Sequence, residues 1–292
     1  MNRKDFLKLL AIAPLTLSAM KLTDFAKVTE DFEQTDKMPV LFIGHGSPMN
    51  GIEENEFVAN WRNIAKGLKS KPKAILCISA HWETKGTQLT AMDNPKTIHD
   101  FGGFPRELFE VQYPAPGSPD LAKQVQEIIK PTQAILDHGW GLDHGAWTIL
   151  RPMFPDADIP IIQMSLDYTL SPEKHIDLAK QLDILRSKGV LIVGSGNIVH
   201  NLRTIDWRNP QGGYDWAIEA NNGLKNMIDK NDLTSLSKAF NLSQAYRLAI
   251  PTLDHYLPLL YTTALRGKND HVEFFNDATV MGSISMTCLK IG

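Results

Sequence analysis

Histidine is the residue type in this sequence that offers the most chemistry. The chain has nine histidines and only two cysteines, Cys77 and Cys288. Imidazole is the commonest metal ligand among side chains, and it also takes and gives protons near neutral pH. A metal site in this chain would therefore use nitrogen and oxygen ligands, which suit Zn(II) or Fe(II) rather than an iron–sulfur cluster.

Two histidines directly follow short apolar runs that have the character of buried strands. His45 follows residues 39–43, and His81 follows residues 74–79. His200 comes six residues after a third such run, 190–194. Ligands of open α/β sheets bind beyond the carboxyl ends of the strands, so we expect these imidazoles at one site. No pair has the helical HExxH spacing, so local spacing does not define a ligand set.

The other histidines differ in their surroundings. His144 lies in Asp-His-Gly and His255 in Asp-His-Tyr, both typical of loops or helix starts. His99 lies in a segment rich in glycine and aromatic residues, which is either the wall of a pocket or an ordinary structured loop. The remaining three lie in polar contexts and are expected to be solvated: His138, His175 and His271.

Apolar runs alternate with amphipathic segments along the chain. We expect strands at 39–43, 74–79, 159–166, 190–194 and 283–291. We expect helices at 54–68, 118–129, 175–188, 216–228 and 234–240, with Gly189 ending the third. This alternation predicts an α/β fold: a single domain over 38–292, with a mostly parallel or mixed central sheet and helices on both faces.

Residues 1–37 differ from the rest of the chain. A basic start, residues 1–8, precedes an apolar run of twelve residues, 9–20. That run is too short for a membrane-spanning helix, which needs about 20 residues. The layout resembles a twin-arginine export signal in which Lys4 replaces the second arginine. The extension is either such a signal, followed by a linker, on a periplasmic protein, or a frayed amphipathic helix on a cytoplasmic enzyme.

The overall composition excludes several protein classes. The chain of 292 residues is 43% hydrophobic and 22% charged, with a formal net charge of -3. These values are ordinary for a globular protein and argue against a disordered chain. They give no electrostatic footprint for nucleic acid. No GxSxG, complete GxGxxG or P-loop pattern is present. The sequence predicts no membrane span and carries no sign of a particular oligomeric state.

Seven motifs together resemble those of a known family. In order along the chain they are GHGSP (44–48), SAHW (79–82), IHDFGGFP (98–105), YPAPG (113–117), DHG (143–145), GNIVHNL (196–202) and HYLPL (255–259). They are similar to the motifs of the 4,5-DOPA-extradiol-dioxygenase family, within the class III (LigB-like) extradiol ring-cleavage enzymes. The resemblance runs from about residue 38 to residue 292. It implies a LigB-like α/β fold with one divalent metal, Fe(II) or Zn(II).

The resemblance also implies roles for individual residues. His45, His81 and His255 match metal ligands, and His200 matches either a further ligand or an acid/base group. His144 matches an active-site residue facing the substrate, so His144 and His200 are the candidates for proton transfer. We find no obvious glutamate to complete the two-histidine, one-carboxylate triad of many iron oxygenases, which keeps zinc open beside iron.

The implied reaction is the cleavage of a catechol ring, DOPA-like, by O₂. It requires a metal with open positions, a base for the catechol proton and a proton donor for the O–O bond that breaks. The expected pocket walls are His99, Phe101, Phe104, Trp82 and Tyr113. Two alternatives remain open at this stage: a zinc-dependent hydrolase that activates water, and a non-catalytic metal-binding protein on the same fold.

Overall fold

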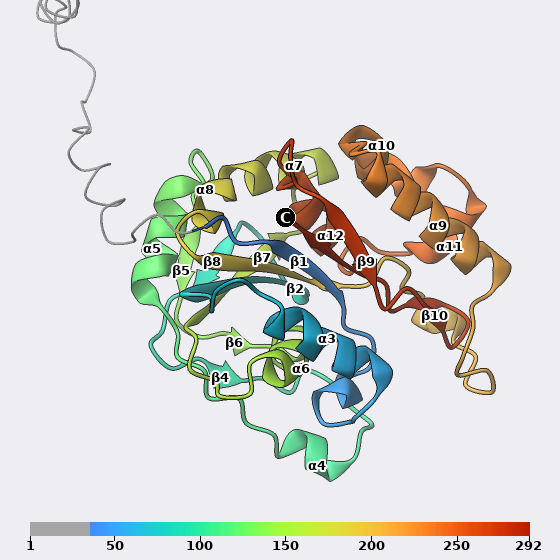
Figure 1. Cartoon of the computed structure of the whole chain (residues 1–292), viewed down its shortest axis with the longest axis horizontal. Coiled ribbons are helices and arrows are strands. Elements are labelled where there is room, and N and C mark those ends of the chain that lie inside the picture. Colours follow the sequence, from blue (N-terminus) through green and yellow to red (C-terminus); the bar gives the residue numbers. More distant parts are fainter. Residues whose placement is uncertain (1–35) are drawn as a thin grey trace, which may run out of the picture. The chain divides into compact units, whose positions relative to one another are not determined.

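The computed structural model describes residues 36–292, so the expected signal segment lies outside the described residues. Within the described range, eight strands form one sheet in the order β5-β3-β7-β2-β8-β1-β12-β9 (Figure 1). Their bounds are β1 (Val40–Gly44), β2 (Ala74–Thr84), β3 (Gln88–Thr90), β5 (Ile135–Asp137), β7 (Ile161–Asp167), β8 (Val190–Gly196), β9 (Val272–Phe275) and β12 (Cys288–Ile291).

The sheet is mixed, as expected. Strands β7, β2, β8 and β1 run parallel to one another and form its centre. Strands β12 and β9 add antiparallel pairs on one side, and β3 pairs antiparallel with β7 on the other. Short pairs flank the sheet: β4 (Lys96–Thr97) with β6 (Gly141–Leu142), and β10 (Thr279–Val280) with β11 (Ile284–Ser285).

Side-chain alternation along the central strands creates two cores. In β1, Val40 and Phe42 join one hydrophobic cluster, whereas Leu41 and Ile43 join another. Successive strand residues point to opposite faces of the sheet, and both faces are buried here. Because both faces are buried, the sequences of these strands are continuous apolar runs.

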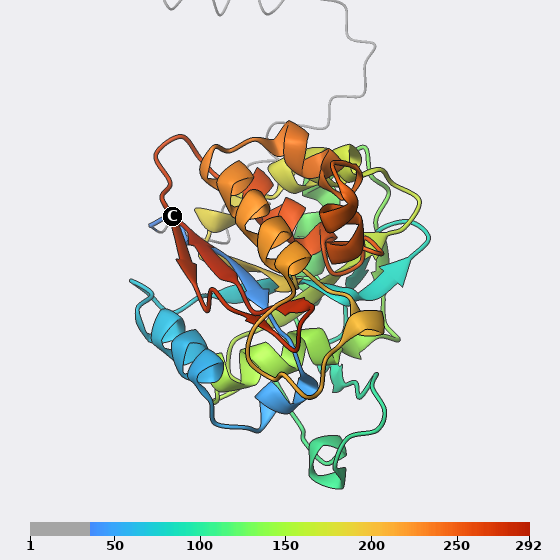
Figure 2. The same cartoon turned by 90° about the vertical axis from the view of Figure 1, so that its right-hand side faces the viewer.

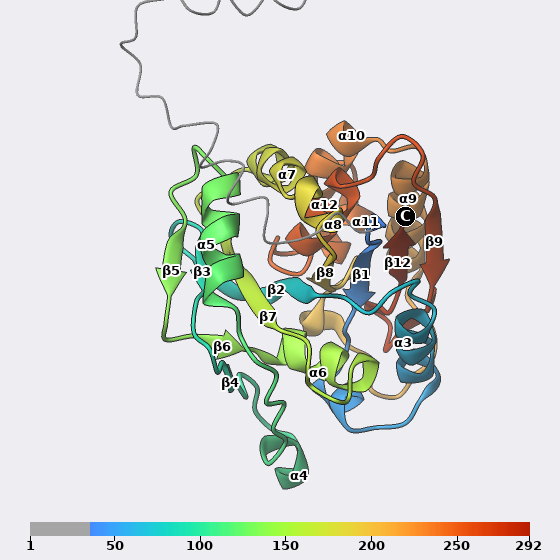
Figure 3. The same cartoon turned by 60° about the vertical axis from the view of Figure 1, so that its left-hand side comes forward.

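Helices cover both faces of the sheet. The face of Leu41 and Ile43 packs against α3 (Glu56–Lys66) and α6 (His144–Met153). The opposite face packs against α5 (Pro119–Ile128), α7 (Pro172–Gln181), α9 (Asp215–Asp229) and α12 (Leu257–Ala264). Figures 2 and 3 show these two groups on opposite sides of the strands. The remaining helical segments are η1 (Pro48–Gly51), α4 (Arg106–Phe109), α8 (Asp183–Arg186), η2 (Leu202–Thr204), α10 (Leu233–Lys238), η3 (Ala239–Asn241) and α11 (Gln244–Ala249).

The helix expected at 175–188 and the strand expected at 283–291 are each divided in the structure. The helix expected at 175–188 begins earlier and is divided into α7 and α8, although Gly189 does follow it with a φ of 81°. The strand expected at 283–291 is broken into β11 and β12, which belong to different sheets. Ser285 and Thr287 both donate hydrogen bonds to the Asn221 side chain, and the chain leaves regular pairing between β11 and β12.

The arrangement of the central strands determines where a site can form. The carboxyl ends of β2, β8 and β1 lie side by side, because these strands are parallel neighbours in the sheet. The described residues, 36–292, belong to one compact unit. Within the described part of the chain, no helix is both long and apolar enough to cross a membrane.

Candidate active site

His45 begins the loop after β1, and strand β8 fixes its ring. Its backbone N–H donates to the carbonyl of Gly196 at 3.1 Å, and its Nδ1 lies 3.0 Å from Ser195 Oγ. The Ser195 hydroxyl donates its proton to the carbonyl oxygen of Gly145, which can only accept. Ser195 must therefore accept from His45 Nδ1–H. The lone pair of His45 then lies on Nε2.

His81 lies within β2 rather than after it. The strand continues to Thr84, and its pairing with β7 shifts register between Ile78 and Glu83, so His81 occupies an irregular stretch. Its Nε2 lies 3.3 Å from Nε2 of His45. Gly145 packs against the ring, because a Cβ at Gly145 would lie 2.7 Å from His81 Cδ2. A glycine at this position allows α6 to approach the imidazole.

His255 precedes α12 and is held by a carboxylate. Its Nδ1 lies 2.7 Å from Asp254 Oδ2, so the ring donates Nδ1–H to the acid and keeps its lone pair on Nε2. Its carbonyl accepts from the backbone N–H of Asn197 at 3.0 Å. Gly196 makes this approach possible, because a Cβ there would lie 2.2 Å from the carbonyl oxygen of His255.

These three imidazoles form a compact group of donors. Their ring centroids lie 4.9–5.2 Å apart, and one nitrogen from each lies within 4.8 Å of the others. Burial, and then repulsion from neighbouring histidines, lowers the pKa of His45 and of His81 well below the ordinary value. Neutral imidazoles whose lone pairs face one another at short range fit a bound cation, which would relieve their repulsion.

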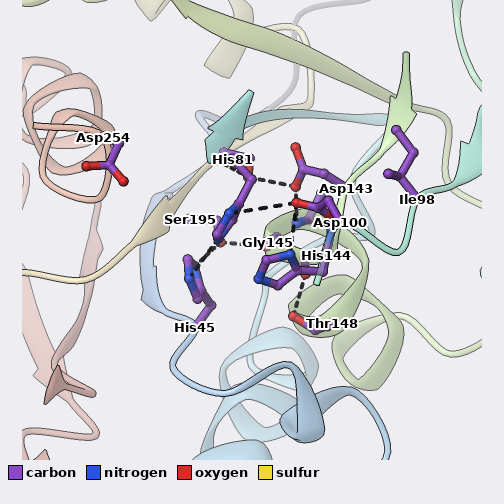
Figure 4. A network of polar contacts seen from close by, with 12 residues as sticks. His45, His81, Ile98, Asp100, Asp143, His144, Gly145, Thr148, Ser195 and Asp254 are labelled. Atoms are coloured by element: carbon purple, nitrogen blue, oxygen red, sulfur yellow. Dashed lines mark hydrogen bonds and ion pairs between the residues drawn. The ribbon is translucent and has the colours of Figure 1, made fainter. Parts of the chain in front are cut away.

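His144 and Asp100 form a second group beside the first (Figure 4). His144 is the first residue of α6, and its Nδ1 lies 2.9 Å from Asp100 Oδ2. Asp100 Oδ1 accepts the backbone N–H of His144 at 2.8 Å. Burial alone would raise the pKa of Asp100, but the contacts with His144 lower it below the ordinary value. Asp100 is therefore an anion that orients the His144 ring.

Asp100 is a candidate for the carboxylate of a two-histidine, one-carboxylate metal site. His81, Asp100 and His144 form an alternative donor group, with one candidate ligand atom from each within 4.8 Å of the others. Both oxygens of Asp100 already contact His144, whereas the His45, His81 and His255 group keeps free lone pairs. The three-histidine group therefore fits a metal better.

His200 lies against His255 rather than in the compact donor group. The two rings stack with centroids 3.5 Å apart and planes inclined by 8°. Burial, and then repulsion from His255, lowers the pKa of His200 to about 3. The side chain also lines the cavity described next, where it could meet a substrate.

All five of these histidines line one cavity of about 370 Å³. The complete lining is His45, Gly46, Ser47, Pro48, His81, Asp100, Phe101, Phe104, His144, His200, Leu202, Ile205, Trp207, His255, Met281 and Ile284. Phe101 and Phe104 lie in the wall, as the sequence predicts, with ring centroids 5.4 Å apart. The cavity therefore combines a polar histidine end with a predominantly apolar wall.

Three expected wall residues lie outside the cavity lining. Trp82 is buried and stacks on Trp140, because its side chain and that of His81 alternate along the strand. His99 Nε2 lies 3.0 Å from the carbonyl oxygen of Val111, and the ring packs behind Phe101. Tyr113 is buried and donates to backbone carbonyls of α6 and its C-cap.

The residues missed by the sequence analysis are those that hold the histidines. Asp100 and Asp254 each directly neighbour a histidine in sequence, which is the one local signal they carry. Ser195 lies inside a Gly-Ser-Gly run, which by itself indicates only a tight turn. It lies within β8, where parallel pairing with β1 brings it to His45.

One of the three histidines expected to be solvated is not. His138 and His271 are exposed, as predicted. His175 is fully buried, and its Nδ1 lies 2.8 Å from the Tyr261 hydroxyl. It lies on the face of α7 that also carries Leu178 and Ala179, so helical periodicity buries it despite its polar neighbours.

Comparison with known proteins identifies the family. Residues 38–274 match the catalytic LigB subunit of aromatic ring-opening dioxygenase. The chain is 42% identical to the 4,5-DOPA dioxygenase extradiol of Escherichia coli (strain K12), over 88% of this chain and 95% of that protein. It is 35% identical to the protein of the same name from Beta vulgaris, over 86% of this chain and 95% of that protein.

A solved structure agrees with these relatives. The crystal structure of an uncharacterized protein from Escherichia coli K12 superposes with a TM-score of 0.74 at 38% identity, covering 87% of this chain and 100% of that chain. LigB dioxygenases use a metal, and the histidine and aspartate cluster fits that requirement. The chain belongs to the LigB family of aromatic ring-opening dioxygenases, and its activity is extradiol ring cleavage.

Proposed function

We propose that His45, His81 and His255 hold one divalent metal through Nε2, and that the metal of the active enzyme is Fe(II). Three nitrogen ligands on one side leave positions open for a catechol and O₂. When bound, such a metal acidifies the catechol hydroxyls and brings the ring and O₂ together. His200, stacked on His255, is either a fourth ligand or an acid/base group next to the ligands.

His144 is the proposed proton-transfer residue. Its Nδ1 lies 2.9 Å from Oδ2 of the anionic Asp100, which leaves Nε2 as the basic atom of a ring that lines the cavity. That nitrogen can take the proton of a catechol hydroxyl and later return a proton to an oxygen derived from O₂. Asp100 stabilises the imidazolium that exists between the two transfers.

The substrate is a catechol whose ring is DOPA-like, as the names of the relatives indicate. Phe101 and Phe104 flank the histidines and offer apolar faces to a flat ring. In extradiol cleavage both oxygen atoms of O₂ enter the product. The ring C–C bond that breaks joins one hydroxyl-bearing carbon to the neighbouring carbon that bears no hydroxyl. The observation that carries the proposal is the convergence of three oriented imidazoles next to the Asp100–His144 pair in one cavity.

Metal reconstitution tests the proposal. The full chain is stripped of metal, loaded anaerobically with Fe(II) and mixed with O₂ and a panel of catechols. We expect O₂ uptake to match formation of a yellow ring-opened product, and no uptake from the Zn(II)-loaded protein. Hydrolysis of activated esters by the zinc form, without O₂ uptake by the iron form, would instead indicate a zinc hydrolase. Tight metal binding with neither activity would indicate a non-catalytic metal-binding protein.

A further inference from the structure

A second cavity, of about 840 Å³, lies next to the active-site cavity. It lies between the start of α3 and the segments around residues 211 and 280, and Phe57, Val280 and Met286 are among the side chains that line it. Glu56 and Gln211 also line it and are exposed, so this cavity opens to solvent. We call it the side cavity.

A thin partition separates the side cavity from the active-site cavity. Ser47 and Met281 line both cavities. Gly46 lines the active-site cavity and Met286 lines the side cavity, and a Cβ at Gly46 would lie 2.5 Å from Met286 Sδ. Gly46 directly follows the proposed ligand His45. The side cavity therefore reaches to within one layer of side chains of the histidine end.

The two methionines are parts of this partition that can move. The carbonyl of Met281 accepts from the N–H of Asp206 at 2.9 Å, and its own N–H donates to the carbonyl of Pro210 at 3.3 Å. The N–H of Met286 donates to the carbonyl of Ala278 at 2.8 Å. Both backbones are therefore held, whereas the side chains are unbranched and have three rotatable bonds each. Rotation of these side chains opens a gap between the two cavities without any movement of the backbone.

The proposed reaction needs two molecules at the metal at the same time. The active-site cavity meets solvent near Leu202 and Trp207, which are 61% and 77% exposed. A catechol that enters there and binds to the histidines lies between the metal and that opening, so it obstructs the same path for O₂. We propose, on the basis of the proposed function, that O₂ reaches the histidine end through the side cavity and passes between Met281 and Met286.

The chemistry of the two methionines suits O₂ better than a catechol. A thioether donates no hydrogen bond and accepts only weak ones. A catechol between the methionines would lose hydrogen bonds to water that the partition does not replace, and that loss costs free energy. O₂ is small and apolar and has no such cost. The partition therefore passes O₂ and keeps the catechol in the active-site cavity.

Relaxation caused by dissolved O₂ tests the passage in the metal-free full chain. The methionine methyl groups are isotope-labelled for NMR, and O₂, which is paramagnetic, accelerates the relaxation of each methyl group that it contacts. Met164 is the reference, because it is as deeply buried as Met286 but lines neither cavity. We expect a several-fold larger enhancement at Met286 than at Met164. An equal or smaller enhancement at Met286 would overturn the inference.

A variant that fills the side cavity provides the kinetic measurement. Val280 lines the side cavity but not the active-site cavity. In Fe(II)-loaded enzyme at saturating catechol, Val280→Trp should lower kcat/KM for O₂ several-fold and leave KM for the catechol unchanged. Leu242→Trp is the control, since Leu242 is exposed and lines neither cavity, and it should change neither parameter. An unchanged kcat/KM for O₂ in Val280→Trp would contradict the inference.

The opposite variant narrows the opening of the active-site cavity. Leu202→Trp should raise KM for the catechol and leave kcat/KM for O₂ unchanged, because Leu202 lines the active-site cavity and not the side cavity. Equal impairment of both substrates would show that O₂ shares the opening used by the catechol. Failure of the unmodified Fe(II)-loaded enzyme to consume O₂ with any catechol would contradict the proposed function itself. The relaxation measurement tests the passage independently, since it uses neither metal nor catechol.

Discussion

A cluster of three histidines and a single buried histidine, His175, have different surroundings in this molecule. His45, His81 and His255 meet at the carboxyl end of the sheet with their nitrogens within 4.8 Å. His175 is fully buried on α7, but its partner is the hydroxyl of Tyr261. The contrast teaches that burial alone does not make an imidazole a ligand. Converging lone pairs are what suit imidazoles to bind a metal, and the Nδ1 partners Ser195 of His45 and Asp254 of His255 turn those lone pairs toward one another.

The largest expected effect comes from removing one of the converging imidazoles. His45→Ala should lower metal affinity by more than the 10- to 100-fold typical of losing an outer partner. Elemental analysis after dialysis measures the metal content per chain. His138→Ala is the control, because His138 is exposed and lies outside the cavity. Retention of one metal per chain by His45→Ala would remove the distinction between the three-histidine cluster and His175.

Removal of His144 separates proton transfer from metal binding. His144→Ala should reduce kcat by about 10²- to 10⁴-fold, the usual contribution of a general acid/base, while the metal content stays unchanged. Steady-state O₂ uptake and elemental analysis measure the two properties. Asp100→Asn is the companion variant, and it should lower kcat by less. Loss of metal from either variant would favour His81, Asp100 and His144 as the ligand group.

Changes to Ser195 and Asp254, which contact Nδ1 of His45 and of His255, should have a smaller effect on metal affinity. Ser195→Ala and Asp254→Asn should each weaken metal binding by about 10- to 100-fold, because each releases one ligand ring from its orientation. Competition with a coloured chelator measures the affinity. Asp158→Asn serves as the control, since Asp158 forms an exposed ion pair with Lys71 away from the cavity. Unchanged affinity in both variants would show that backbone packing alone orients the rings.

The smallest expected effect is on stability, and it belongs to His175. Burial lowers the pKa of His175 to about 4, below the ordinary 6.5. Between pH 6.5 and 4 the unfolded chain therefore binds a proton at this residue that the folded chain does not. Stability is fully present above pH 6.5 and is lost as the pH falls toward 4.

A variant isolates the share of His175 in this acid sensitivity. In metal-free protein, His175→Gln should lose roughly 1–2 kcal/mol less unfolding free energy than the unmodified chain between pH 7 and pH 5. Urea titrations at the two pH values measure the difference. The site histidines remain in both proteins and cancel from the comparison. Parallel losses in the two proteins would contradict the assignment of a depressed pKa to His175.

The sequence predicted what depends on local pattern. Alternating apolar runs and amphipathic segments predicted the mixed α/β sheet. The position of His45 after an apolar run predicted its place at the carboxyl end of a central strand. Trp82 shows the limit of this reasoning. It is adjacent to His81, but strand alternation turns its side chain away from the cavity.

Contacts between residues that are far apart in the chain could not be predicted from the sequence. Ser195 meets His45 only because β8 pairs with β1, and Gly145 meets His81 only because α6 packs at the end of β2. Asp100 contacts His144 across 44 positions of sequence. These contacts depend on the assembled tertiary fold, and they decide which nitrogen of each imidazole is free.

Strand β8 has a consequence for how the protein gains and loses its metal. Ser195 fixes the ring of His45, the carbonyl of Gly196 accepts the His45 N–H, and Asn197, which directly follows the strand, donates to the carbonyl of His255. Two of the proposed ligands are thus attached to one rigid strand, so folding of the sheet preorganises them before any ion arrives. Metal exchange should proceed without refolding. The ion taken up then depends on which metals the surroundings supply, because imidazole ligands suit several of them.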